Sequence, residues 1–165
     1  MPRTYLGGHT SFRPGQLHQL EAGALVLRAG RAAGLLVRTE HPVPAPTPGG
    51  RRARGEVDVC WFCPRSGRVL IAWEVDGHDA GEAHFLGSAV KDTAGNRSKL
   101  TACAAPISVQ LLYSVKNDLS PKPASKRVEI SKWMTGVAEV TTDEELMAPG
   151  GIEMWMKRAV DLSRR

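Results

Sequence analysis

The stretch Glu56–Gly77 decides the fold, and it reads EVDVCWF, then CPRSGR, then VLIAWEVDG. The first and third pieces are mostly apolar and have the length of strands. The middle piece has the Pro and Gly of a turn, so the stretch predicts a β-hairpin. Side chains two apart in a strand project from the same face. Glu74 and Asp76 therefore point the same way at the end of a strand that otherwise reads as buried, and Asp58 on the preceding strand could join them.

Two acids at the end of a buried strand need a partner, because a buried unpaired carboxylate is costly. A bound divalent cation is a common partner, since Mg²⁺ prefers oxygen ligands and keeps several of its waters. Asp58, Glu74 and the backbone carbonyl of Val75 would be its ligands, with Asp76 as a further carboxylate. A structural interpretation stays open beside this one. Asp76-Gly77 is also ordinary turn chemistry after a strand, and Asp58 could pair with an arginine.

The elements around the hairpin predict an α/β fold. They are, in order, a helix up to Gly30, a strand at Ala33–Thr39, a loop at His41–Gly55, the hairpin, a helix from about Glu82 to Ala105 and a strand at Ile107–Val115. Antiparallel strands followed by a crossover helix and one more strand make a mixed four-stranded core sheet flanked by helices.

The 165 residues suit a single domain with a real core. We place this core at about residues 12–115 and treat residues 116–165 as a C-terminal extension. Within the extension, Asn117–Lys126 reads as a loop and Arg127–Val140 as one or two strands. The last segment is an amphipathic helix that begins at Gly150-Gly151.

This order of elements, with acids on the second and third strands, resembles the PD-(D/E)XK nuclease superfamily and its restriction-endonuclease-like αβββαβ core. The segment Trp73–Gly77 followed by a helix is most similar to the branch related to very-short-patch repair endonucleases, which carries a Glu-Val-Asp-Gly motif. The resemblance implies a metal-dependent endonuclease that hydrolyses DNA phosphodiester bonds in repair, restriction or mobile-element biology. Asp58 and Glu74 match the strand acids that hold Mg²⁺ or Mn²⁺. Glu21 matches an acid that many members carry on the first helix.

The sequence departs from the superfamily where a catalytic Lys is usual. That position, two residues after Glu74, is held by Asp76, as in the related branch. We expect His78 or Lys99 to stand in for the Lys, with Lys91 as a further candidate. The missing Lys also keeps a second function open, namely a non-catalytic nucleic-acid-binding or interaction module on a degenerate nuclease fold.

Basic side chains favour DNA as the partner. The net charge of +5 suits anionic partners in general. Arg51, Arg52 and Arg54 in the Pro/Gly-rich loop, together with Lys91 and Arg97 of the following helix, could track a phosphate backbone. A merely solvated basic loop explains the same arginines equally well. A homodimer would suit double-strand cutting, whereas one active site can nick alone.

Other features indicate a cytoplasmic protein without a membrane segment. The sequence has no apolar run of about 18 residues and no apolar signal segment after Met1. Its three cysteines are an odd number and fit a reducing compartment. Cys60 and Cys63 have the spacing of zinc ligands, but a structural zinc site normally needs four ligands and only Cys103 remains. Cys60 is therefore expected to be a small buried apolar residue, and no small-molecule cofactor is implied.

Overall fold

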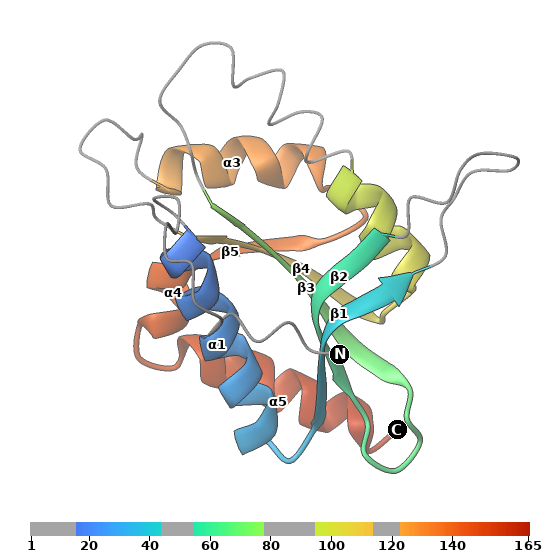
Figure 1. The fold of residues 1–165 in the computed structure, drawn as a ribbon. Coiled ribbons are helices and arrows are strands. Elements are labelled where there is room, and N and C mark those ends of the chain that lie inside the picture. The colour runs from blue at the N-terminus through green and yellow to red at the C-terminus, as the bar shows by residue number, and fades with distance from the viewer. Residues whose placement is uncertain (1–15, 44–54, 78–94, 114–122) are drawn as a thin grey trace, which may run out of the picture.

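A mixed five-stranded sheet forms the centre of the protein (Figure 1). The computed structural model describes residues 16–43, 55–77, 95–113 and 123–165. The strands are β1 (Leu36–Val43), β2 (Gly55–Phe62), β3 (Val69–Gly77), β4 (Ile107–Tyr113) and β5 (Glu139–Thr142). They lie in the order β1-β2-β3-β4-β5. The pairs β1–β2 and β2–β3 are antiparallel, and the pairs β3–β4 and β4–β5 are parallel.

Helices cover both faces of this sheet (Figure 1). They are α1 (Gln16–Ala32), a helix over residues 95–103, α3 (Pro123–Trp133), α4 (Asp143–Met147) and α5 (Gly151–Ser163). One layer contains α1, α4 and α5, which pack on the face that carries Trp61 and Trp73, here called the tryptophan face. The other layer contains α3 and the helix over residues 95–103, which pack on the face that carries Cys60 and Ala72. In the middle of β2 and β3, neighbouring side chains thus enter two different cores, as the strand period requires.

The contact between α1 and the tryptophan face is close. Trp61 donates a hydrogen bond from Nε1 to the carbonyl oxygen of Val26 at 3.1 Å. A Cβ atom at Gly30 would lie 2.5 Å from that same Nε1 atom. Trp61 also lies against Trp73, which in turn contacts Trp155 of α5 edge to face, with ring centroids 5.1 and 5.4 Å apart. Three large aromatic side chains therefore join the sheet to its first helical layer.

The predicted α/β class is confirmed, but the predicted strand number is wrong. The hairpin of β2 and β3 is present, and β4 lies parallel to β3. The sheet has five strands rather than four because β5, from the C-terminal extension, pairs with β4. The extension therefore widens the sheet instead of only packing on it.

The prediction of strands over Arg127–Val140 is wrong for most of that range. The structure has α3 up to Trp133, and only the end of the range enters β5. Val128 and Ile130 are two residues apart, which looks like strand alternation, yet Val128 is exposed. Ile130 and Met134 are buried in the same core at helical i,i+4 spacing, and that packing decides for the helix.

Two element boundaries also move. β1 begins at Leu36, because α1 runs to Ala32 and is followed by a turn in which Gly34 has φ +77°. β1 continues to Val43, where a loop was predicted. Pro42 is compatible with this strand because β1 is an edge strand. The helix predicted over Glu82–Ala105 is seen over residues 95–103 and ends before Ala104, while residues 82–94 lie outside the described residues. Residues 44–54 of the predicted loop also lie outside them.

The C-terminal helix begins where the glycine pair predicted. Gly150 has φ +77°, and a Cβ atom at Gly151 would lie 2.0 Å from the carbonyl oxygen of Glu145. Both positions therefore require glycine at the turn between α4 and α5. No helix within the described ranges is both long and apolar enough to cross a membrane.

Candidate functional site

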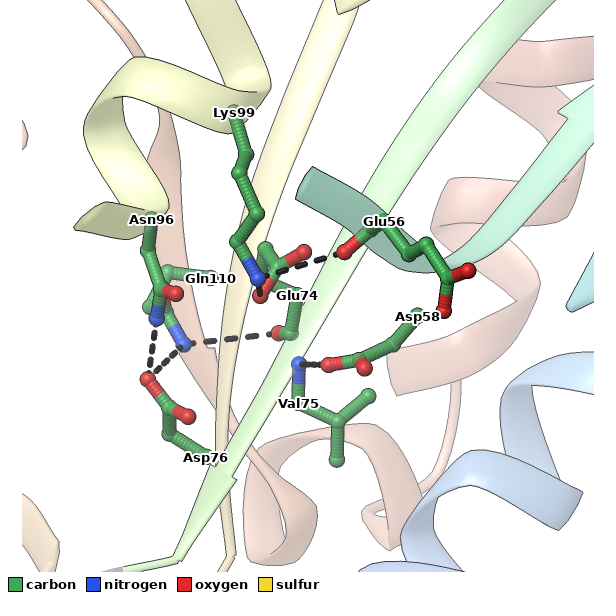
Figure 2. A network of polar contacts seen from close by, with 8 residues as sticks. All are labelled: Glu56, Asp58, Glu74, Val75, Asp76, Asn96, Lys99 and Gln110. Carbon is green, nitrogen blue, oxygen red and sulfur yellow. Dashed lines mark hydrogen bonds and ion pairs between the residues drawn. The ribbon is translucent and has the colours of Figure 1, made fainter. Parts of the chain in front are cut away.

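Glu74 of β3 is a buried carboxylate with one partnered and one unpartnered oxygen. Its exposed fraction is 1%. Oε2 lies 2.7 Å from the Nζ atom of Lys99, which reaches it from the helix over residues 95–103 (Figure 2). Oε1 is buried and accepts no hydrogen bond. An unpaired buried carboxylate oxygen is costly, so it marks the place where a positively charged ligand would be favourable.

Asp58 lies beside Glu74 at the point where β2 and β3 stop pairing. The last paired residues on this side are Val59 and Trp73. Beyond them, Oδ2 of Asp58 accepts a hydrogen bond from the backbone N–H of Val75 at 2.7 Å (Figure 2). The carboxylate thus takes the place of a backbone acceptor and is fixed next to the strand that carries Glu74.

Asp76 is held by two buried side-chain amides. Nδ2 of Asn96 donates to Oδ2 of Asp76 and, at 3.1 Å, to Oε1 of Gln110. Nε2 of Gln110 donates to the same Oδ2 at 3.1 Å and to the backbone carbonyl oxygen of Glu74 at 3.4 Å. Figure 2 shows the three side chains converging from β3, β4 and the helix over residues 95–103. The network fixes both the Asp76 carboxylate and the backbone of Glu74.

Burial and nearby negative charges shift Glu74 and Asp58 toward their neutral forms. Burial, followed by the charge of Asp58, raises the pKa of Glu74 to about 8 from an ordinary 4.5, although Lys99 opposes the shift. Burial also raises the pKa of Asp58 above its usual range, against the opposing hydrogen bond from Val75. Both carboxylates are therefore costly to ionise. A bound cation would favour their ionised forms and so lower both pKa values.

The predicted donor set consists of oxygen atoms, which a hard divalent cation prefers. Among the residues that the structure describes, no three His, Cys, Asp or Glu side chains are grouped closely enough to hold an ion by themselves. The ligand set expected from the sequence needs only the carboxylates of Asp58 and Glu74 and the carbonyl of Val75. Mg²⁺ commonly binds through one or two carboxylates and keeps several waters, so two carboxylates suffice. The unpartnered Oε1 atom of Glu74 is the feature of the structure that supports this fit.

The side chain of Lys99 is positioned by contacts of its ammonium group and of its aliphatic stem. Its Nζ atom donates a second hydrogen bond, to the carbonyl oxygen of Glu56 at 3.2 Å. Its stem passes over Gly55, where a Cβ atom would lie 2.9 Å from Cγ of Lys99. The absence of a side chain at residue 55 thus leaves room for the lysine stem, and the ammonium group reaches Glu74.

The structure brings four of the predicted site residues together, namely Asp58, Glu74, Asp76 and Lys99. Glu21 is exposed on α1, whose helix covers the tryptophan face, whereas Lys99 approaches Glu74 from the other layer. Val75, the source of the predicted carbonyl ligand, lies in the same cluster through its hydrogen bond to Asp58. Five further predicted residues are outside the described ranges: His78, Lys91, Arg51, Arg52 and Arg54.

Arg97 is exposed and donates from Nη1 to the carbonyl oxygen of Trp133 at 2.7 Å. It therefore ties the helix over residues 95–103 to the end of α3.

Sequence reasoning gave no role to Asn96, Gln110 or Glu40. Gln110 could have been noticed as the polar residue in the middle of the buried strand ISVQLLY. It is the direct partner of Glu74 in the β3–β4 register. Glu40 is an exposed residue with φ +50° whose charge acts on Asp58. No pattern in the sequence places it there, because it comes from the neighbouring edge strand.

Three comparisons, with models of protein families, with curated proteins and with solved structures, give no match for this chain.

Proposed function

We propose that this protein is a metal-dependent endonuclease that hydrolyses DNA phosphodiester bonds, with Asp58 and Glu74 as its metal-holding carboxylates. The observation that carries the proposal is the state of Glu74. Its carboxylate is buried, borders a second buried carboxylate, and has an oxygen without a partner. A structural acid at this depth would be expected to have both oxygens satisfied.

The element order supports the same proposal. A helix, three antiparallel strands, a second helix and a parallel strand follow one another from α1 to β4. This is the order of the restriction-endonuclease-like core, in which the second and third strands carry the acids. In this chain Asp58 lies on β2 and Glu74 on β3.

The chain's own groups have distinct tasks in this proposal. A bound Mg²⁺ or Mn²⁺ ion supplies neutralisation of the phosphate charge and activation of the attacking water. Lys99 replaces the lysine that the nuclease pattern carries two residues after the glutamate, and its ammonium group orients the water or the phosphate from the helix side. Asp76, held by Asn96 and Gln110, keeps the backbone of β3 in register with the site.

Cleavage of supercoiled plasmid tests the proposal. We expect nicking or linearisation with Mg²⁺ or Mn²⁺, and its loss both with EDTA and in Glu74→Ala. Glu153→Ala is the matched control, because Glu153 is an exposed acid on α5, in the other helical layer. Cleavage that survives Glu74→Ala, or that Glu153→Ala removes equally, would refute the assignment of the site.

Two observations favour a second function. Asp76 occupies the usual lysine position, and the described residues contain no group of three acids that could hold an ion alone. A non-catalytic nucleic-acid-binding module would bind DNA without divalent metal and would be unaffected by Glu74→Ala. If the plasmid stays intact while such binding is measured, this second function replaces the first.

A further inference from the structure

The helix over residues 95–103 contacts β3 through two polar side chains. Asn96 donates from Nδ2 to the carboxylate of Asp76, and Lys99 donates from Nζ to Oε2 of Glu74 at 2.7 Å. Figure 2 shows both side chains extending from the helix toward the strand. The two contacts follow in opposite order along the two segments, so the helix runs antiparallel to β3.

The spacing of these contacts suits a helix beside a strand. Glu74 and Asp76 are two residues apart, which is about 6.6 Å along a strand. Asn96 and Lys99 are three residues apart, which places them on one helix face and about 4.5 Å apart along its axis. The long side chain of Lys99 covers the difference. Both acids can therefore be contacted at the same time.

The contact of Asn96 is directional, because its amide has a single workable orientation. Nδ2 also donates to Oε1 of Gln110 at 3.1 Å, so both of its N–H bonds have acceptors. Nε2 of Gln110 likewise donates twice, to Asp76 at 3.1 Å and to the carbonyl oxygen of Glu74 at 3.4 Å. Turning either amide over would set oxygen against oxygen. The network therefore holds Asn96 at one position against β3 and β4.

Apolar packing alone would not fix the helix so narrowly. Leu100 follows Lys99 and is buried, with 1% exposure, in the core that contains Ala72 and Leu112. Burial of apolar surface has no preferred direction, so Leu100 holds the helix against the sheet without fixing its rotation. Asn96 is 6% exposed, and its hydrogen bonds depend on distance and angle. Asn96 thus fixes the register of a helix that Leu100 attaches.

The position of the helix decides where the Lys99 ammonium group lies. Nζ donates both to Glu74 and to the carbonyl oxygen of Glu56, and Cγ of the same side chain would lie 2.9 Å from a Cβ atom at Gly55. These contacts depend on the distance from the helix to β2 and β3. A shift of about 1 Å away from Glu74 would lengthen that hydrogen bond beyond its usual limit.

We propose that Asn96 is a positioning residue, which sets the helix over residues 95–103 where the Lys99 ammonium group meets Glu74. Asp76 holds the place in which the nuclease pattern usually has its lysine, so the acid at that place anchors the helix that brings the replacement. The inference deepens the proposed endonuclease and rests on it for its effect on cleavage. The placement of Lys99 itself is measured without metal or DNA.

Proton–nitrogen NMR spectra of the lysine ammonium groups in the full-length protein test this placement. The Lys99 resonance is identified by its absence in Lys99→Met and should differ from that of Lys157, whose side chain is 80% exposed. In Asn96→Leu, which has nearly the same size but no donor, the Lys99 resonance should move toward that of Lys157. The indole N–H of Trp61, which is hydrogen-bonded in the other helical layer, shows in the same spectra whether the fold is kept.

Thr101→Ala is the matched control, because Thr101 is exposed on the same helix and donates to the carbonyl oxygen of Arg97 within it. It should leave the Lys99 resonance in place. If Asn96→Leu does not fold, Asn96→Ser, which is too short to contact both partners, is measured in the same way. The proposal is overturned by a folded Asn96 variant that keeps the wild-type Lys99 resonance, or by an equal displacement in Thr101→Ala. A wild-type Lys99 resonance at the position of Lys157 would also overturn it.

Plasmid cleavage separates this role from the proposed endonuclease. If Asn96 acts through Lys99, Asn96→Leu should lower kcat toward that of Lys99→Met, and the double variant should cleave no more slowly than Lys99→Met alone. A further loss in the double variant would show that Asn96 acts by another route and would overturn the proposal. Absence of cleavage by the wild type would refute the endonuclease, whereas the ammonium resonance would still decide whether Asn96 places Lys99.

Discussion

The Nζ atom of Lys99 lies 2.7 Å from Oε2 of Glu74, so a helix on one side of the sheet supplies the cation for a carboxylate at the end of a central strand. The pair is asymmetric, because the lysine side chain is 27% exposed and the glutamate side chain 2% exposed. Lys99 therefore remains reachable from solvent while Glu74 does not. In the proposed endonuclease, this exposure would allow Lys99 to exchange its partner when a phosphate or a cation enters.

Removing the ammonium group should weaken both the fold and the proposed cleavage. Lys99→Met keeps most of the stem that passes over Gly55 but loses the hydrogen bonds to Glu74 and Glu56. We expect the free energy of unfolding to decrease by about 1.5–3 kcal/mol, the usual range for a lost hydrogen bond to a charged group. Urea denaturation at pH 7 measures this change, and the plasmid assay should show loss of cleavage.

Lys157→Met is the control for that substitution. Lys157 also pairs with an acid, Asp161, at 3.0 Å, but its side chain is 80% exposed. Exposed ion pairs contribute little, so the change should stay within about 0.5 kcal/mol. Equal losses in both variants would show that burial of Glu74 does not strengthen its contact with Lys99.

The buried Glu74 should make stability fall as pH rises. Its pKa is about 8 in the folded protein and 4.5 ordinarily. Between these values the folded state keeps a proton that the unfolded state has lost, so its contribution is complete below about pH 4.5 and disappears as pH passes 8. At about 1.4 kcal/mol per pH unit, the loss has an upper limit of about 5 kcal/mol.

Urea denaturation from pH 5 to pH 8.5 measures this effect against Glu74→Gln, which has the same shape and cannot ionise. The stability of the wild type should decline relative to that of the variant over this range. The raised pKa of Asp58 acts in the same direction but is common to both proteins. Parallel stability curves would contradict a strongly raised pKa at Glu74.

Divalent metal should bind more tightly as pH rises, because the ion requires the ionised form of Glu74. Below the raised pKa of about 8, binding should release close to one proton from this residue, and affinity for Mg²⁺ or Mn²⁺ should increase about tenfold per pH unit. Calorimetric titration in two buffers with different ionisation enthalpies gives the number of protons released. Removal of the ion with EDTA should lower the melting temperature of the metal-bound protein to that of protein without added metal. A pH-independent affinity would place the metal elsewhere.

Much of the central sheet could be predicted because its strands carry strong local signals. β2 and β3 are apolar runs joined by a Pro-Arg-Ser-Gly turn, and β4 is an apolar run after Pro106. The i,i+2 rule was enough to predict that Glu74 and Asp76 share a face, and both indeed contact the same helix through Lys99 and Asn96.

The parts that could not be predicted depend on contacts between distant segments. β5 has only four residues and no apolar run, and it becomes a strand because the edge of β4 is available. α3 has an apolar spacing that fits either a strand or a helix until Ile130 and Met134 meet the core. Gln110 and Glu40 acquire their relation to the site from the register of neighbouring strands, which one strand's own sequence does not encode.

Two glycines of α1 should respond to alanine in opposite directions. At Gly30 a new Cβ atom would lie 2.5 Å from Nε1 of Trp61 and 2.7 Å from Cγ2 of Val37, whereas at Gly23 nothing lies within 4 Å. Gly30→Ala should therefore force α1 away from the sheet, disturb the hydrogen bond from Trp61 to Val26 and lower the free energy of unfolding by about 1–3 kcal/mol. Gly23→Ala should raise it by about 0.5–1 kcal/mol, since alanine is the better helix former. Urea denaturation of the two single variants decides the matter, and a stabilising Gly30→Ala would contradict the close packing of α1 on Trp61.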